Sequence, residues 1–222
     1  FRRSTVCPTT TSGCSQFAVL EQVTYAHRTR MHALVHTLSL ATPAGFSGIE
    51  GLIFNLSVVS MSGPASSDIR FAPRPSSVCS LQVGTILTPE LPGGANVTVS
   101  VCSADLPLGG FEFLAPAPGS VTPPIVLLTV IRTSLDSSDP ERDAQQEFAA
   151  ISSIPYGQLL QEHEAEWQRL NADTLVVQDS DGNDNSLVGA TAAASLYYIL
   201  SAIRPDWPWS LSPGGIATDV YN

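Results

Sequence analysis

Short runs of apolar and β-branched residues recur along the first 135 residues, separated by stretches rich in Pro, Gly and Ser. The runs cover residues 17–23, 33–40, 52–59, 97–101 and 125–131. Apolar and polar positions alternate from Val97 to Val101, which is the period of a half-buried strand. Several short strands without a helical period between them predict an antiparallel β-sandwich, with residues 52–59 forming a strand inside it.

A helical pattern replaces the strand pattern from residue 136 onward. Ser138 is a capping residue, Pro140 falls in the first turn and Glu141 follows three positions after Ser138, so a helix is expected to start here. Pro155 ends this helix, and a second one is predicted over 156–170. Its apolar side is expected to consist of Leu159, Leu160, His163, Trp167 and Leu170.

The last helical segment, 186–203, is apolar on nearly every side. Such a helix must be buried all round or lie in a membrane, and its alanines and two tyrosines make a poor membrane span. We therefore expect its packing partners to lie after Asn222, so that the chain stops inside a domain. The predicted organisation is a β-sandwich over 1–135, a helical linker over 136–180 and the start of a further domain over 181–222.

Charge limits the classes of partner. All ten basic residues are Arg, and 20 acidic residues leave a net charge of −10. A field of this sign repels phosphate groups, so nucleic acid and anionic membrane surfaces are not expected partners. The longest apolar run, 125–131, is also far shorter than the about 20 residues of a membrane helix.

The cysteines and two glycosylation sequons favour an extracellular or vacuolar/lysosomal protein. Four cysteines permit three pairings, and we expect Cys7–Cys14 and Cys79–Cys102, the second joining neighbouring strands. Asn55 and Asn96 begin Asn-Leu-Ser and Asn-Val-Thr sequons. The alternative is that the thiols are free and buried and that the sequons are unused.

Few residues suggest chemistry by themselves. His32 and His36 are four apart but fall in a strand pattern without a third ligand, so structural histidines are expected rather than a metal site. Gly182 is in the fourth position of an acidic loop, whereas a calcium loop of the EF-hand type needs Gly in the sixth. The remaining candidates, Glu162, Glu164 and Glu166, are interpreted as a solvated helix face. No catalytic residue, metal or cofactor is therefore predicted within the chain.

Four segments resemble glycoside hydrolase family 65. They are Tyr-Ala-His-Arg-Thr-Arg at 25–30, His-Glu-Ala-Glu-Trp at 163–167, Ser-Leu-Tyr-Tyr-Ile-Leu-Ser at 195–201, and the 211–222 loop that begins Leu-Ser-Pro-Gly-Gly. The resemblance covers about residues 20–222. This family includes acid trehalases, the glucosidase that acts on glucosylgalactosyl-hydroxylysine of collagen, and disaccharide phosphorylases. It implies an N-terminal β-sandwich, a helical linker and a catalytic barrel of paired helices, of which this chain would contain only the first helix.

The resemblance implies an inverting α-glucosidase whose catalytic carboxylates come after Asn222, so the chain alone is expected to be inactive. The loop at 211–222 would approach the glucoside substrate, with Gly214, Gly215, Asp219 and Tyr221 as its neighbours. From the residues alone, a purely structural loop is an equal alternative. Two other functions stay open: a non-catalytic sandwich that binds carbohydrate or protein, and a disaccharide phosphorylase.

Overall fold

The computed structural model describes most of the chain, and its two compact units divide after His163. The described residues are 2–6, 18–45, 52–56, 68–87, 94–107, 109–172, 187–201 and 203. The first unit, 1–163, contains the described strands, and the second, 164–222, contains the last described helix.

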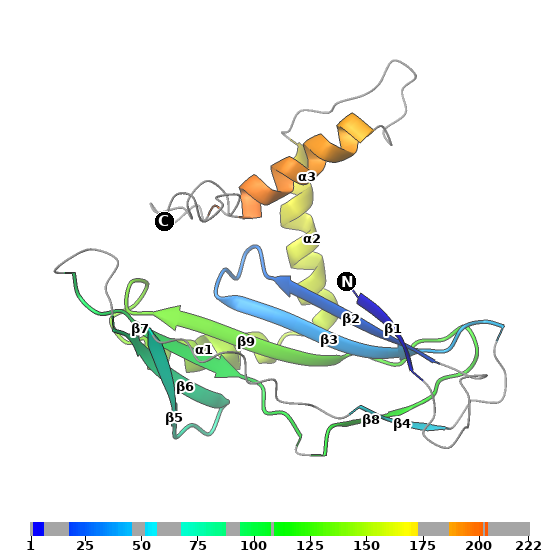
Figure 1. Cartoon of the computed structure of the whole chain (residues 1–222), viewed down its shortest axis with the longest axis horizontal. Helices are drawn as coiled ribbons and strands as arrows, with labels where there is room; N and C mark the ends of the chain where they lie inside the picture. Colours follow the sequence, from blue (N-terminus) through cyan, green and yellow to red (C-terminus); the bar gives the residue numbers. More distant parts are fainter. Residues whose placement is uncertain are drawn as a thin grey trace. The chain divides into compact units, whose positions relative to one another are not determined.

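The first unit is built on a seven-stranded antiparallel sheet (Figure 1). In spatial order its strands are β1 (Arg2–Val6), β2 (Ala18–Ala26), β3 (Ala33–Ala41), β9 (Ile125–Thr133), β7 (Thr98–Ser103), β6 (Ser80–Ile86) and β5 (Ile69–Arg74). Strand β9 comes last along the chain but lies in the middle of the sheet. It places Leu128 opposite Val35 of β3 and Ile131 opposite Val101 of β7. The sheet therefore consists of two three-stranded parts joined through β9.

A smaller sheet covers one face of the large one. It pairs β4 (Ile53–Leu56) with β8 (Phe111–Leu114). A core forms between the sheets, whose buried members are Ala18, Leu20, Leu38, Leu40, Phe54, Phe113 and Ala115. This arrangement confirms the predicted antiparallel β-sandwich. The strand predicted at 52–59 is present as β4, in the smaller sheet of the sandwich. It is buried on one face, not on both: Phe54 is 6% exposed and Ile53 is 57% exposed. Residues 57–59 lie outside the described residues.

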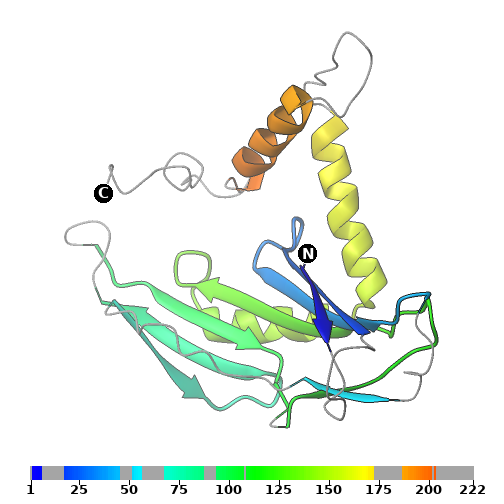
Figure 2. The same ribbon diagram turned by 45° about the vertical axis from the view of Figure 1, so that its right-hand side comes forward.

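The opposite face of the large sheet is covered by α1 (Pro140–Ser152) (Figure 2). Residues alternate along a strand between the two faces, so Val35 of β3 faces the helix while Leu38 and Leu40 face the smaller sheet. The helix contributes Ala144, Phe148 and Ile151 to a second core. Most of the apolar burial of the unit is thus divided between two cores, one on each face of the sheet.

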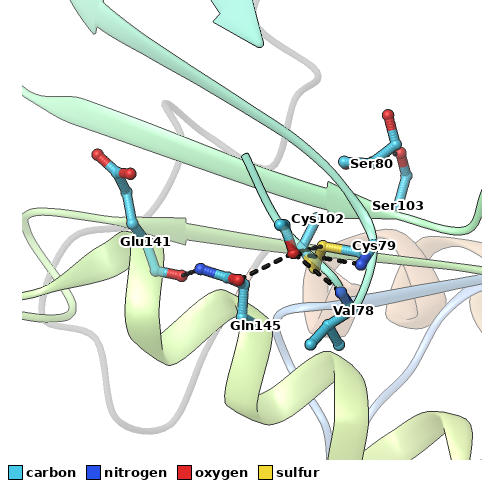
Figure 3. Close-up of a disulfide and its surroundings, with 8 residues drawn as sticks. Val78, Cys79, Ser80, Cys102, Ser103, Glu141 and Gln145 are labelled. Atoms are coloured by element: carbon cyan, nitrogen blue, oxygen red, sulfur yellow. Dashed lines mark hydrogen bonds between the residues drawn. A yellow bond between two sulfur atoms is a disulfide. The ribbon is translucent and has the colours of Figure 1, made fainter. Parts of the chain in front are cut away.

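A disulfide joins Cys79, which immediately precedes β6, to Cys102 of the adjacent β7 (Figure 3). This is the pairing expected from the sequence. Gln145 of α1 lies beside it. The Gln145 Oε1 accepts a hydrogen bond from the Ser76 hydroxyl at 2.9 Å, and the Gln145 Nε2 donates one to the Glu141 carbonyl at 3.2 Å. The other two cysteines, Cys7 and Cys14, lie outside the described residues.

Helix α1 begins one residue later than predicted. Asp139, not Ser138, is the N-cap, and its Oδ1 accepts the backbone N–H of Arg142 at 3.2 Å. Pro140 takes the first helical position, where its missing N–H costs nothing. Ser138 and Asp139 are both good capping residues, so the local pattern did not separate them.

Replacing Asp139 with Ala should lower the free energy of unfolding by about 1 kcal/mol, because the first turn loses the acceptor for one of its free N–H groups. Thermal unfolding followed by circular dichroism measures the loss. The matched control is Ser138→Ala, at an exposed position that does not cap the helix, and it should leave stability unchanged. Equal losses in both variants would contradict the assignment of the cap.

Two further helices follow α1. Helix α2 is Tyr156–Ala172 and α3 is Leu187–Ser201, close to the predicted ranges. Within the second unit, the rings of Trp167 and Tyr197 lie 5.0 Å apart. None of the helices in the described ranges combines the length and apolar character needed to cross a bilayer. The residues between α2 and α3, which include the acidic loop around Gly182, lie outside the described residues.

Candidate functional site: the contact between the 25–30 segment and helix α2

The two segments that carried the resemblance near the sandwich, 25–30 and the start of 163–167, contact each other. Strand β2 ends at Ala26, and the tight connection to β3 is closed by hydrogen bonds between His27 and Ala33 and between Ala33 and Arg30. The His27 ring braces the same turn, because its Nδ1 accepts the backbone N–H of Arg30 at 3.2 Å. We call the contact of this turn with residues 159–163 of α2 the turn–helix site.

Two histidines connect the turn to α2. His27 is 1% exposed, and its Nε2 donates to the backbone carbonyl of Leu159 at 2.9 Å. In the second bond the side chain comes from α2 and the backbone group from the turn: Nδ1 of His163 accepts a hydrogen bond from the Arg28 N–H at 3.2 Å. The Tyr25 ring lies 4.4 Å from that of His163, and the two imidazoles are 5.7 Å apart. The rings thus fill the space between strand end and helix while satisfying backbone groups on both sides.

An ion pair borders the site. Nε and Nη2 of Arg30 donate to Oε2 of Glu162 at 3.0 and 2.8 Å, and Gln158 donates to Oε1 at 2.9 Å. These contacts differ from the solvated face predicted for the glutamates: Glu162 binds the turn, and Glu166 pairs with Arg169 of the same helix. Glu164 is exposed.

Burial sets the protonation of the histidines. It lowers the pKa of His27 and of His163 below the ordinary value of 6.5. The Arg30 charge lowers the pKa of His27 further, while the Leu159 hydrogen bond and Glu162 oppose the shift. The hydrogen bond from Gln158 and then that from Arg30 lower the pKa of Glu162. At neutral pH the site therefore holds two neutral imidazoles and an ionised Arg30–Glu162 pair.

The other two histidines make separate structural contacts. His32 Nδ1 lies 3.4 Å from Oε2 of Glu147 in α1, and its Nε2 lies 3.7 Å from Asp136. His36 forms a hydrogen bond with the hydroxyl of Thr24 across the β2–β3 pair. Among the residues that the structure describes, no group of three or more His, Cys, Asp or Glu side chains could hold a metal ion.

The turn–helix site positions the start of a helix. The Thr29 hydroxyl lies 3.3 Å from Nδ1 of His27, but this nitrogen also accepts the backbone N–H of Arg30 and the ring is buried. The single carboxylate of the site, Glu162, is neutralised by Arg30, so the arrangement fits a positioning role rather than bond cleavage. The residues expected near a substrate, Gly214, Gly215, Asp219 and Tyr221, lie outside the described residues. The two sequon asparagines are described, and the side chains of Asn55 and Asn96 are both exposed.

Comparison with known proteins identifies relatives that process glycosides. No family model matches the chain. A protein-glucosylgalactosylhydroxylysine glucosidase from Dictyostelium discoideum is 40% identical over 65 residues, which are 29% of this chain and 8% of that relative. A solved structure described as a kojibiose phosphorylase from the human microbiome superposes on 90% of the chain, with a TM-score of 0.52 and 8% identity. The chain covers 25% of that structure.

Proposed function

Because the chain resembles glycoside hydrolase family 65, a resemblance that the curated relative confirms, we propose that it is the N-terminal part of a larger inverting α-glucosidase. The observation that carries the proposal is the identity with a glucosidase over 65 residues. The likeness to a phosphorylase is one of fold alone. The proposed substrate is therefore an α-glucoside of the trehalose or glucosyl-galactosyl type, and the proposed reaction is hydrolysis.

The exposed apolar side chains of helix α3 are evidence that the longer protein has a further helical domain. Tyr197, Tyr198 and Ile199 are 54%, 58% and 48% exposed, although the helix is apolar around its circumference. A helix of this composition is normally buried on all sides. We propose that helices of a catalytic α/α barrel, encoded downstream, cover α3, while the sandwich and α2 support that barrel.

In the proposed reaction, an acid protonates the leaving oxygen while a base activates water on the other side of the sugar ring. The two carboxyl groups must lie about 6.5–9.5 Å apart across the substrate. We propose that both come from the barrel, because Glu162 and Glu166 are engaged in ion pairs. The proposed contribution of this chain to the glucoside pocket is the loop with Gly214, Gly215, Asp219 and Tyr221, whose glycines would let backbone approach the sugar.

Product analysis of the full reading frame tests the proposal. The longer protein should release glucose from trehalose or from glucosylgalactosyl-hydroxylysine without phosphate. Proton NMR should detect β-glucose first from the glucosylgalactosyl substrate, and equal initial amounts of α- and β-glucose from trehalose, because its leaving half keeps the α configuration. The 222-residue chain should release none. Glucose 1-phosphate formed only with phosphate would instead identify a phosphorylase. Sugar binding without turnover by the longer protein would favour the non-catalytic alternative.

We also propose that the protein follows the secretory route to an extracellular or vacuolar/lysosomal location. The Cys79–Cys102 disulfide and the exposure of Asn55 and Asn96 are consistent with this route. Protein expressed in a eukaryotic secretory host should lose mass on treatment with peptide N-glycosidase. Asn55→Gln and Asn96→Gln should each remove part of that shift, and an unchanged mass would contradict glycan attachment.

A further inference from the structure

The turn–helix site depends on two imidazole nitrogens that carry no proton. The backbone N–H of Arg30 points at Nδ1 of His27, and the backbone N–H of Arg28 points at Nδ1 of His163. A backbone N–H can only donate, so each Nδ1 must be the acceptor. His27 additionally uses its Nε2 proton for the Leu159 carbonyl, which fixes its tautomer.

The surroundings disfavour a charge on either ring. From the turn, the site is faced by the cations Arg28 and Arg30, and from β2 by the neutral phenol of Tyr25. From α2 it is faced by the anion Glu162, whose charge is already shared with Arg30. Protonating both imidazoles would place two further positive charges 5.7 Å apart in this partly desolvated space.

We propose that the turn–helix site is an acid-sensitive latch, in which protonation of His27 and His163 releases the first two turns of α2 from the β2–β3 turn. A proton on Nδ1 of His163 turns the acceptor of the Arg28 N–H into a donor that faces another donor, so this link between α2 and the turn is lost. A proton on Nδ1 of His27 removes the acceptor of the Arg30 N–H inside the turn, where the Thr29 hydroxyl also lies 3.3 Å away, and leaves the Nε2 bond to Leu159 in place. His27 favours release because its charged ring is poorly solvated while α2 is docked. Such a latch would act whether or not the longer protein is a glucosidase.

The direction of the pH dependence follows from the histidines. Both have a pKa lowered by burial when α2 is docked, and an ordinary pKa near 6.5 when it is released. The released state therefore binds more protons below pH 6.5. The full stabilisation of docked α2 is therefore present above pH 6.5. It is lost as the pH falls from there through the lowered pKa values of His27 and His163. Glu162 has a lowered pKa and stays ionised over this range.

Amide hydrogen exchange of the 222-residue chain between pH 7.5 and 5.0, corrected for intrinsic exchange rates, tests the latch. Protection at Arg28, Arg30 and residues 159–163 should fall with a limiting slope near two in log protection per pH unit, one for each histidine. In His163→Asn the slope should approach one, because the Asn amide oxygen can accept the Arg28 N–H but does not titrate. A slope near zero in the unmodified chain would overturn the proposal.

A matched control separates the latch from general acid sensitivity. Burial also lowers the pKa of His36, but this residue contacts Thr24 and not α2. His36→Asn should therefore leave the slope at residues 159–163 unchanged, and a reduced slope there would contradict the latch. If His163→Asn does not fold, NMR titration of the unmodified chain decides. The His27 and His163 resonances should titrate together with the loss of protection, and titration without that loss would overturn the proposal.

Discussion

Replacing Phe148 with Ala should lower the free energy of unfolding by about 3–5 kcal/mol, the usual cost of removing a buried phenyl ring. Phe148 is 7% exposed and lies in the core between α1 and the large sheet. It packs in the same cluster as Leu128 and Val130 of the central strand β9, so the cavity would open where the two parts of the sheet meet. Urea unfolding followed by circular dichroism measures the loss as a lower midpoint with an unchanged slope.

The control for this variant is Gln146→Ala, at an exposed position of the same helix. It should change stability by no more than about 0.5 kcal/mol, because surface substitutions away from caps and cores have small effects. A loss below about 1 kcal/mol for Phe148→Ala would mean that α1 is not part of the stable core.

Removing the disulfide by the double substitution Cys79→Ala and Cys102→Ala should cost about 3 kcal/mol. The bond joins residues 23 positions apart and so restricts a loop of the unfolded chain. It also ties β6 to β7, which lie on the side of the sheet away from β2 and β3. Equilibrium unfolding in urea measures the loss.

The same protein under dithiothreitol serves as the control for the disulfide variant, since reduction breaks the bond but keeps both sulfur atoms in the core. Reduced wild-type protein and the double variant should lose similar stability. If the reduced protein keeps the stability of the oxidised one, the bond does not restrain the unfolded chain.

Hydrophobic pattern predicted the sandwich because its central strands are apolar and uninterrupted. Strands β2, β3, β7 and β9 lie close to the predicted runs. Strand β5 was missed since it is an exposed edge strand with Pro73 and two arginines, residues that favour sheet edges but obscure a strand pattern. In β6, Gly84 interrupts the apolar alternation, and the reason is steric: a Cβ there would lie 2.9 Å from Cγ1 of Ile69 on β5.

The turn–helix site could be predicted only in part. The resemblance singled out both of its segments, but nothing in either segment indicates that they meet. The Arg28 N–H and His163 are 135 positions apart, so the contact depends on where β9 and α1 direct the chain. Periodicity along α2 identified the apolar side with Leu159 and His163, yet it could not reveal that Glu162 has an arginine partner in the turn.

The central position of β9 has a consequence for biosynthesis. After β7 has left the ribosome and before residues 104–133 have followed it, the emerged chain contains β3 and β7, each with an edge that awaits β9. Such edges can pair with other nascent chains, and the contact of Leu38 with Ile125 joins residues far apart in the sequence, which slows folding. We therefore expect the yield of soluble protein to depend on chaperones that shield these edges until Thr133 has left the ribosome.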